Sequence, residues 1–169
     1  MDVDGFITCG HAFSFNTTAV SVYYPSGYIG NLNPSKKQYS GTVDAAFVTL
    51  NGSVVDTHVG TTNISLNLYG SIVVPVGGSV KMYGMTSLEQ DGLVLVASFA
   101  STGTTPHLTD MVKTDYASAG GDSGGIVCSR YMRRNYYVAG IQSRRATNGS
   151  YSVYCKVGNI NSALGVTLE

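Results

Sequence analysis

Short strand-like segments, each ended by a turn signal, follow one another along the whole chain of 169 residues. Residues 19–24 alternate small and apolar side chains, as a half-buried strand does. Residues 43–50 form a continuous strand-like run that stops at Asn51 and Gly52, a hairpin-type dipeptide. No window of 11 or more residues keeps a helical period, except weakly at the C-terminus. The pattern therefore predicts an all-β fold.

Further turn signals divide the rest of the chain. Residues 28–32 read as a short strand ended by Asn-Pro at 33–34, and residues 93–100 as a strand that begins after a tight Asp-Gly turn at 91–92. Residues 72–76 are expected to cross between two halves of the molecule. Short strands at this spacing are typical of a sandwich or a barrel.

Composition supports an all-β fold and argues against nucleic acid or a membrane surface as a partner. The chain is 43% hydrophobic but only 12% charged, contains 21 glycines and no tryptophan, and is expected to be extracellular and rich in turns. The formal net charge is zero, which gives no electrostatic reason to expect nucleic acid or a membrane surface as a partner. The basic cluster of Arg130, Arg133 and Arg134 is interpreted as a hairpin tip. No run of 18 apolar residues exists, and any secretion signal would lie outside this chain.

A glycine-rich loop at residues 119–125 reads Ala-Gly-Gly-Asp-Ser-Gly-Gly. A serine hydroxyl becomes a useful nucleophile when it is exposed beside a base, with backbone N–H groups aimed at the developing oxyanion. Glycines allow the backbone to turn sharply and to present such N–H groups. The loop therefore predicts Ser123 as a nucleophile. The alternative interpretation is a polar β-turn.

Two other segments strengthen the catalytic interpretation. Residues 5–12 read Gly-Phe-Ile-Thr-Cys-Gly-His-Ala, a short strand that leads into His11, and residues 41–48 read Gly-Thr-Val-Asp-Ala-Ala-Phe-Val, with Asp44 near the head of a strand. A base, an acid and a nucleophile thus occur in the chain order His11, Asp44, Ser123.

These segments resemble the catalytic segments of chymotrypsin-like serine proteases, in particular the bacterial branch that includes the streptogrisins and α-lytic protease. The similarity extends to a cleft-lining strand at residues 137–143, a strand behind the specificity pocket at 152–157 and a closing helix at 159–164. The resemblance implies two antiparallel β-barrels of the six-stranded type and a short C-terminal helix. It divides the chain into an N-terminal half, residues 1–72, and a C-terminal half, residues 73–169.

The resemblance also implies a serine endopeptidase that needs no cofactor and no metal and acts on peptides or proteins. The catalytic residues would be His11, Asp44 and Ser123, with an oxyanion hole formed by the N–H groups of Gly121 and Ser123. The substrate-binding residues it implies are Ala117, Ser118, Ala119, Gly120, Ser143, Arg144, Arg145 and Ser152. No acid stands among them, which argues against selection of lysine or arginine. They allow a preference for apolar side chains, which we favour, or for acidic ones with an arginine as counter-charge.

The chain departs from this family in two places. Few residues precede the histidine segment, so the N-terminal barrel is expected to lack its first strands and to receive them from a preceding segment, a propeptide or a second copy. The Asp122 carboxylate is expected to be buried beside a cation such as Lys81 or the N-terminus, or else to be solvated.

The three cysteines leave two readings open. Cys128 and Cys155 are placed to bridge or to remain free buried thiols, and Cys9 is interpreted as a small packing residue. The rival classes of function are a catalytically inactive, protease-like β-barrel binding protein and a structural surface protein.

Overall fold

The structure, a computed structural model, describes residues 4–15, 18–24, 27–52, 58–59, 64–65, 68–101, 106–131 and 135–167. Strands dominate it, and the predicted all-β class is confirmed. The strands are β1 (Gly5–Thr8), β2 (Ser21–Tyr24), β3 (Gly27–Ser40), β4 (Val43–Leu50), β5 (His58–Val59), β6 (Ile64–Ser65), β7 (Leu68–Ser71), β8 (Ser79–Gly84), β9 (Leu88–Ser101), β10 (Leu108–Thr114), β11 (Ile126–Tyr131), β12 (Asn135–Arg145) and β13 (Ser152–Lys156). The helices are a single 3₁₀ turn, η1 (His11–Phe13), and α1 (Val157–Leu164).

The N-terminal half contains an antiparallel sheet of four strands in the order β1-β4-β3-β2. Strand β4 is buried from Val43 to Val48, because side chains on both of its faces are covered. Such a strand reads as a continuous run rather than as an alternation. Among the described residues no pairing joins β1 to β2, so this sheet is open.

Strand β3 corrects the turn predicted at residues 33–34, because it runs through Asn33 and Pro34 to Ser40. The ladder between β3 and β4 shifts register between Leu32 and Lys37. Proline has no N–H to give to a ladder and is tolerated at such an irregularity. The amide oxygen of Asn33 accepts a hydrogen bond from the N–H of Ser35 at 3.1 Å, which stabilises the bend.

The C-terminal half is a closed barrel. Strands β11-β8-β9-β10-β13-β12 are hydrogen-bonded in that order, and the pairing of β11 with β12 closes the ring. This confirms the expected six-stranded barrel. Strand β7 pairs in parallel with β12, so the second sheet begins shortly before residue 73. Residues 133 and 134 of the expected basic hairpin tip, between β11 and β12, lie outside the described residues.

The turn predicted at residues 91–92 is also corrected, since β9 passes straight through it. A Cβ on Gly92 would lie 2.7 Å from the backbone nitrogen of Tyr116, so glycine serves here to admit a neighbouring backbone. Beside this close approach of Gly92 to Tyr116, the Asp115 carboxylate accepts the backbone N–H of Leu93 at 2.6 Å. The turn that joins β8 to β9 lies instead at residues 85–87.

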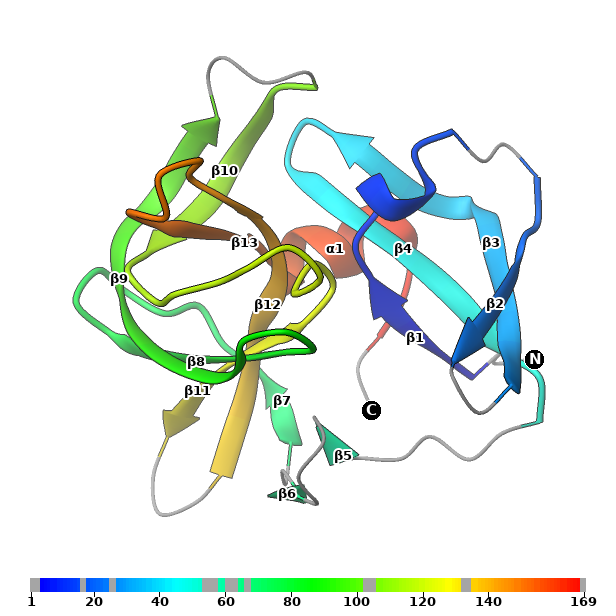
Figure 1. Cartoon of the computed structure of the whole chain (residues 1–169), viewed down its shortest axis with the longest axis horizontal. Helices are drawn as coiled ribbons and strands as arrows, with labels where there is room; N and C mark the ends of the chain where they lie inside the picture. Colours follow the sequence, from blue (N-terminus) through cyan, green and yellow to red (C-terminus); the bar gives the residue numbers. More distant parts are fainter. Residues whose placement is uncertain are drawn as a thin grey trace.

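One hydrophobic cluster joins the two halves. It comprises Val43, Ala45, Phe47, Leu108, Met111, Ile141, Val153, Cys155, Ile160 and Leu164. These residues come from β4 of the first sheet, from β10, β12 and β13 of the barrel, and from α1. Figure 1 shows α1 between the two sheets. Burial of this shared apolar surface sets the position of β4, and so of Asp44, against β12.

All three cysteines are free and buried, so no bridge joins Cys128 to Cys155. Burial raises the pKa of both thiols to about 12. Neither thiol is therefore ionised near neutral pH, and both pack as small apolar groups.

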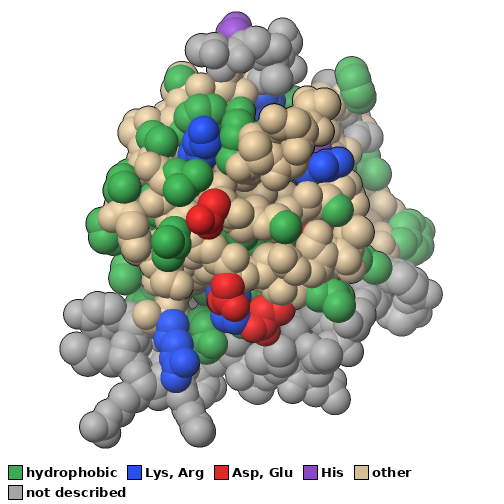
Figure 2. Space-filling model, turned by 60° about the vertical axis from the view of Figure 1, so that its left-hand side comes forward, with side chains coloured by type: hydrophobic (Ala, Val, Ile, Leu, Met, Phe, Trp, Pro, Cys, Tyr) green, Lys and Arg blue, Asp and Glu red, His purple; other side chains and the backbone are tan. Residues whose placement is uncertain are grey.

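The face of the barrel in Figure 2 carries few charged side chains, and hydrophobic ones are scattered across it. Within the part of the chain that the structure describes, no helix is long and apolar enough to cross a membrane.

Candidate active site

His11 stands where β1 of the N-terminal sheet ends. The strand leads through Cys9 and Gly10 into the 3₁₀ turn η1, whose first residue is His11. A Cβ on Gly10 would lie 2.4 Å from the carbonyl oxygen of Gln38, so only glycine allows the turn to pack this closely on β3. The ammonium group of Lys37 donates to the carbonyl of Phe13 at 2.8 Å and anchors the far end of the turn.

The carboxylate of Asp44 holds His11 at two points. Its Oδ1 accepts the backbone N–H of His11 at 2.8 Å, and its Oδ2 lies 2.8 Å from the ring nitrogen Nδ1. Asp44 is fully buried, and its Oδ2 also accepts the hydroxyl of Ser143. A buried carboxylate is stable only with such partners, and these three bonds supply them.

The hydrogen bond to Asp44 raises the pKa of His11 above its ordinary value of 6.5, and contact with the Cys9 thiol adds to this effect. With Asp44 on Nδ1, the other ring nitrogen, Nε2, is the one left to exchange a proton with a nucleophile. The pair therefore has the geometry of an oriented base.

The ring of Tyr39 lies against the imidazole of His11, with the ring centroids 5.7 Å apart. The guanidinium of Arg144 donates to the Tyr39 hydroxyl at 2.7 Å and to the carbonyl of Pro106 at 3.1 Å, and it lies 5.3 Å from the centre of the Tyr39 ring. Arg144 thus links the barrel to the N-terminal sheet beside His11. Arg145, the next residue of the strand, is exposed instead.

Ser123 lies in the glycine-rich loop between β10 and β11. The loop is tied to β12, because the N–H of Gly124 donates to the carbonyl of Gln142 at 2.8 Å. A Cβ on Gly124 would lie 2.3 Å from Oγ1 of Thr8, so the loop also packs against the end of β1 that leads to His11.

The Ser123 hydroxyl donates to the backbone carbonyl of Ser143 at 3.3 Å. No hydrogen bond between Ser123 and His11 is present among the described residues. The residues predicted to form the triad therefore meet around Ser143, whose hydroxyl contacts Asp44 and whose carbonyl contacts Ser123.

The two N–H groups predicted to bind an oxyanion belong to Gly121 and Ser123. Gly121 has a φ of +100°, a conformation that other residues rarely adopt. In the described part of the chain neither N–H donates to a backbone carbonyl.

Asp122 has partners that differ from those expected. Its side chain is 1% exposed, and its Oδ1 accepts the backbone N–H groups of Thr86 at 2.7 Å and Ser87 at 2.9 Å. Its Oδ2 accepts the N–H of Ala119 at 2.7 Å. Burial raises the pKa of Asp122, but hydrogen bonds from Ser87, Ala119 and Thr86 outweigh it and hold that pKa below its usual range.

Lys81 does not serve as the counter-charge of Asp122. It forms ion pairs with Glu89 and, at 2.9 Å, with Asp91, its neighbours across the β8–β9 ladder. Among the described residues, backbone N–H groups of Thr86, Ser87 and Ala119 satisfy the carboxylate, and no cation does.

Two of the predicted substrate-binding residues, Ser118 and Ser152, are linked by hydrogen bonds to each other and to their surroundings. The hydroxyls of Ser118 and Ser152 are 2.7 Å apart, and the Ser152 hydroxyl donates to the carbonyl of Tyr116 at 2.8 Å. The amide of Gln142 donates to Ser118 at 3.2 Å and accepts the Tyr116 hydroxyl at 2.6 Å. Ala117 and Gly120 are exposed, and Ala119 is half-buried.

Sequence reasoning missed Gln142, Tyr39 and Thr86. A buried amide in the otherwise apolar run of residues 138–142 was a usable signal for Gln142, because a buried polar group needs a partner. No local signal marks Tyr39 or Thr86, since their contacts lie far away along the chain.

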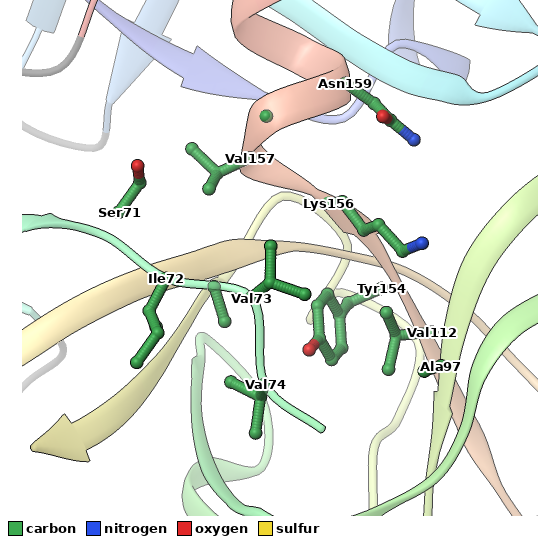
Figure 3. Close-up of a pocket in the computed structure, with 12 residues that line it drawn as sticks. Ser71, Ile72, Val73, Val74, Ala97, Val112, Tyr154, Lys156, Val157 and Asn159 are labelled. Atoms are coloured by element: carbon green, nitrogen blue, oxygen red, sulfur yellow. The ribbon is translucent and has the colours of Figure 1, made fainter. Parts of the chain in front are cut away.

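Two hollows lie near these elements. One, of about 660 Å³, is lined by Arg144, Arg145, Phe99 and Tyr151 among others. The other, of about 170 Å³, lies beside the start of α1, and the predicted catalytic residues do not line it (Figure 3). Its walls are chiefly apolar, including Ile72, Val74 and Tyr154, with Lys156 at its edge.

Among the described residues, no group of three or more histidine, cysteine or acidic side chains is placed to hold a metal ion.

Comparison with solved structures identifies the fold. A protease described as a glutamic acid specific serine protease superposes with a TM-score of 0.80 and 22% identity, over 99% of this chain and 87% of that one. A Nocardiopsis protease gives a TM-score of 0.77 at 22% identity, over 99% and 86% of the two chains. Protease A of Thermobifida fusca gives 0.75 at 20% identity, over 97% and 83%. This chain has the chymotrypsin-like double-barrel fold.

No protein-family model matches the sequence, and no curated protein does. Within the double-barrel fold, His11 and Asp44 come from the N-terminal sheet, whereas Ser123 and Ser143 come from the closed barrel. The candidate site therefore depends on the packing of one half against the other.

Proposed function

We propose that this chain is a serine endopeptidase that hydrolyses peptide bonds through His11, Asp44 and Ser123. The observation that carries the proposal is the arrangement around Ser143, which contacts the Asp44 carboxylate with its hydroxyl and the Ser123 hydroxyl with its carbonyl. Ser143 thus contacts both the acid that would orient the base and the proposed nucleophile, which supports a shared catalytic site at the junction of the two halves.

In the proposed reaction the Ser123 hydroxyl turns from Ser143 to Nε2 of His11. Its oxygen attacks the carbonyl carbon of the substrate while His11 takes the proton. The N–H groups of Gly121 and Ser123 stabilise the oxyanion of the tetrahedral intermediate. His11 then protonates the leaving amine, and water attacks the acyl-enzyme by the same steps in reverse.

Asp44 keeps the proton of His11 on Nδ1 and stabilises the imidazolium that forms during each step. Its double contact with His11 supports this role, since it fixes both the ring and the backbone of that residue. The reaction as proposed uses no metal and no cofactor.

The base of the proposed specificity pocket is neutral. This base would consist of Ala117, Ser118 and Ala119, with Gly120 at the rim of the pocket and Ser152 behind. The walls of the pocket would come from Ser143, Arg144 and Arg145, and the two arginines also border the larger hollow. The glycine-rich composition, low in charge, also supports secretion.

A second candidate is an inactive, protease-like binding protein, which the contact of Ser123 with Ser143 instead of His11 would favour. A fluorophosphonate probe separates the two, because it forms a covalent bond only with an activated serine. The endopeptidase is expected to be labelled, Ser123→Ala to abolish labelling, and Ser150→Ala, at an exposed site, to retain it. Absence of labelling in the unmodified protein would favour the binding protein.

A further inference from the structure

The turn between β8 and β9 lies directly against the loop that carries Ser123. Besides the two N–H groups that it gives to Asp122, this turn places the side chain of Thr86 on the loop backbone. The Thr86 hydroxyl donates to the carbonyl of Gly120 at 2.8 Å. A Cβ on Gly121 would lie only 2.5 Å from the same hydroxyl oxygen, so the contact is close.

The turn is itself held in place. Asp122 binds the N–H groups of Thr86 and Ser87, and the side-chain amide of Gln90 donates to the carbonyl of Ser87 at 2.7 Å. The backbone of Thr86 is thus fixed on the side facing the loop, although its side chain is exposed. This gives the hydroxyl a defined position from which to bind Gly120.

The bond to Gly120 orients the next N–H. A peptide unit is planar and trans, so the C=O of Gly120 and the N–H of Gly121 point in opposite directions. When Thr86 holds the carbonyl, the N–H of Gly121 is directed away from Thr86. Glycines flank this peptide on both sides, and their freedom of rotation allows the unit to turn over if it is not held.

We propose that Thr86 is a positioning residue that fixes the Gly120–Gly121 peptide so that the Gly121 N–H faces the oxyanion. The inference rests on the proposed function, because it assigns the device that prepares the oxyanion hole of that site. Thr86 acts through Gly121 and does not itself touch the substrate. In this chain the β8–β9 turn thereby both stabilises the Asp122 carboxylate and orients the adjacent Gly120–Gly121 peptide.

The test compares Thr86→Val, Thr86→Ser and, as a matched control, Thr109→Val at an exposed position of β10. Valine keeps the shape of threonine but has no hydroxyl. The rate of labelling by a fluorophosphonate and the affinity for phenylboronic acid are measured, because both place an oxygen where the oxyanion forms. Since removing an oxyanion donor outright lowers kcat by about 10²–10³, we expect Thr86→Val to lose roughly 10- to 100-fold in both.

The labelling rate and the phenylboronic acid affinity of Thr86→Ser are expected to stay close to those of the unmodified protein. Those of Thr109→Val are expected to equal them. The pKa of His11, followed by NMR, should be unchanged in Thr86→Val, which separates an effect on the oxyanion hole from general disruption of the site. Equal labelling of Thr86→Val and the unmodified protein would overturn the proposal, as would equal losses in Thr86→Val and Thr86→Ser.

A crystal structure of Thr86→Val provides a readout that is independent of activity. The proposal expects the Gly120 carbonyl to turn away from position 86, and an unmoved carbonyl would contradict it. If the unmodified protein is not labelled at all, the endopeptidase assignment fails, whereas the orientation of this peptide is still decided by the crystal structures.

Discussion

The hydroxyl of Ser123 donates to the backbone carbonyl of Ser143, 3.3 Å away. Ser143 in turn donates its own hydroxyl to Asp44, so one residue of β12 contacts both ends of the proposed catalytic group. In the proposed reaction, Ser123 exchanges this carbonyl for Nε2 of His11. We propose that a change of rotamer at this half-buried side chain makes the exchange.

Asp44→Asn should lower the rate of peptide hydrolysis by about 10⁴. An asparagine amide cannot accept the Nδ1–H as a carboxylate does, and it favours the wrong tautomer of His11. The rate constant for labelling by a fluorophosphonate measures the loss. A variant that retained the full rate while His11→Ala lost it would show that Asp44 does not orient His11.

The rate of labelling should fall as the pH is lowered, with an apparent pKa above 6.5. His11 must be neutral to accept the proton of Ser123, and the hydrogen bond to Asp44 raises its pKa above that ordinary value. NMR titration of the imidazole should give the same raised pKa. An apparent pKa below 6.5 for the labelling rate would contradict the assignment of this titration to His11.

The same shift affects stability. Because the pKa of His11 is raised on folding, its pairing with Asp44 contributes fully below the ordinary pKa of 6.5 and is lost as the pH rises through the raised value. The midpoint temperatures of thermal unfolding of Asp44→Asn and of the unmodified protein should therefore differ more at acidic pH, as long as Asp44 remains ionised. The difference should be smaller in the alkaline range.

Gly121→Ala should nearly abolish labelling, whereas Gly120→Ala should leave it largely intact. Gly121 has a φ of +100° and its Cβ would lie 2.5 Å from Thr86 Oγ1, while a Cβ on Gly120 meets nothing within 4 Å. A small fluorophosphonate reports on the oxyanion hole without filling the specificity pocket. Similar rates for both variants would show that the conformation at Gly121 is not required.

Peptide substrates that differ only in the residue before the scissile bond should be cleaved best when that residue is apolar, and worst when it is lysine or arginine. The pocket base that we propose is neutral, and Arg144 is engaged with Tyr39 and Pro106. The ratio of kcat/KM between leucine and lysine should reach about tenfold or more. A preference for glutamate that disappears in Arg144→Met would establish the acidic alternative instead.

Much of the fold could be predicted because its signals are local. The alternation of residues 19–24 and the run of residues 43–50 each lie in a strand, at least in part, and the barrel of the C-terminal half has the expected six strands. The predicted turns at 33–34 and 91–92 were wrong, because a proline in a bulge and a glycine under a close backbone contact carry the same local signal as a turn.

The sequence by itself determined the strand content and the glycines around the candidate nucleophile, because both depend on residues adjacent in the chain. It also determined the order His11, Asp44, Ser123, because a short local segment marks each of the three residues. Only the tertiary structure decided that backbone N–H groups 35 and 36 residues away stabilise the Asp122 carboxylate, and that Ser143, 99 residues from Asp44, contacts the carboxylate of Asp44. Such contacts depend on how the shared core packs β4 against the barrel, and no local pattern of residues encodes that packing.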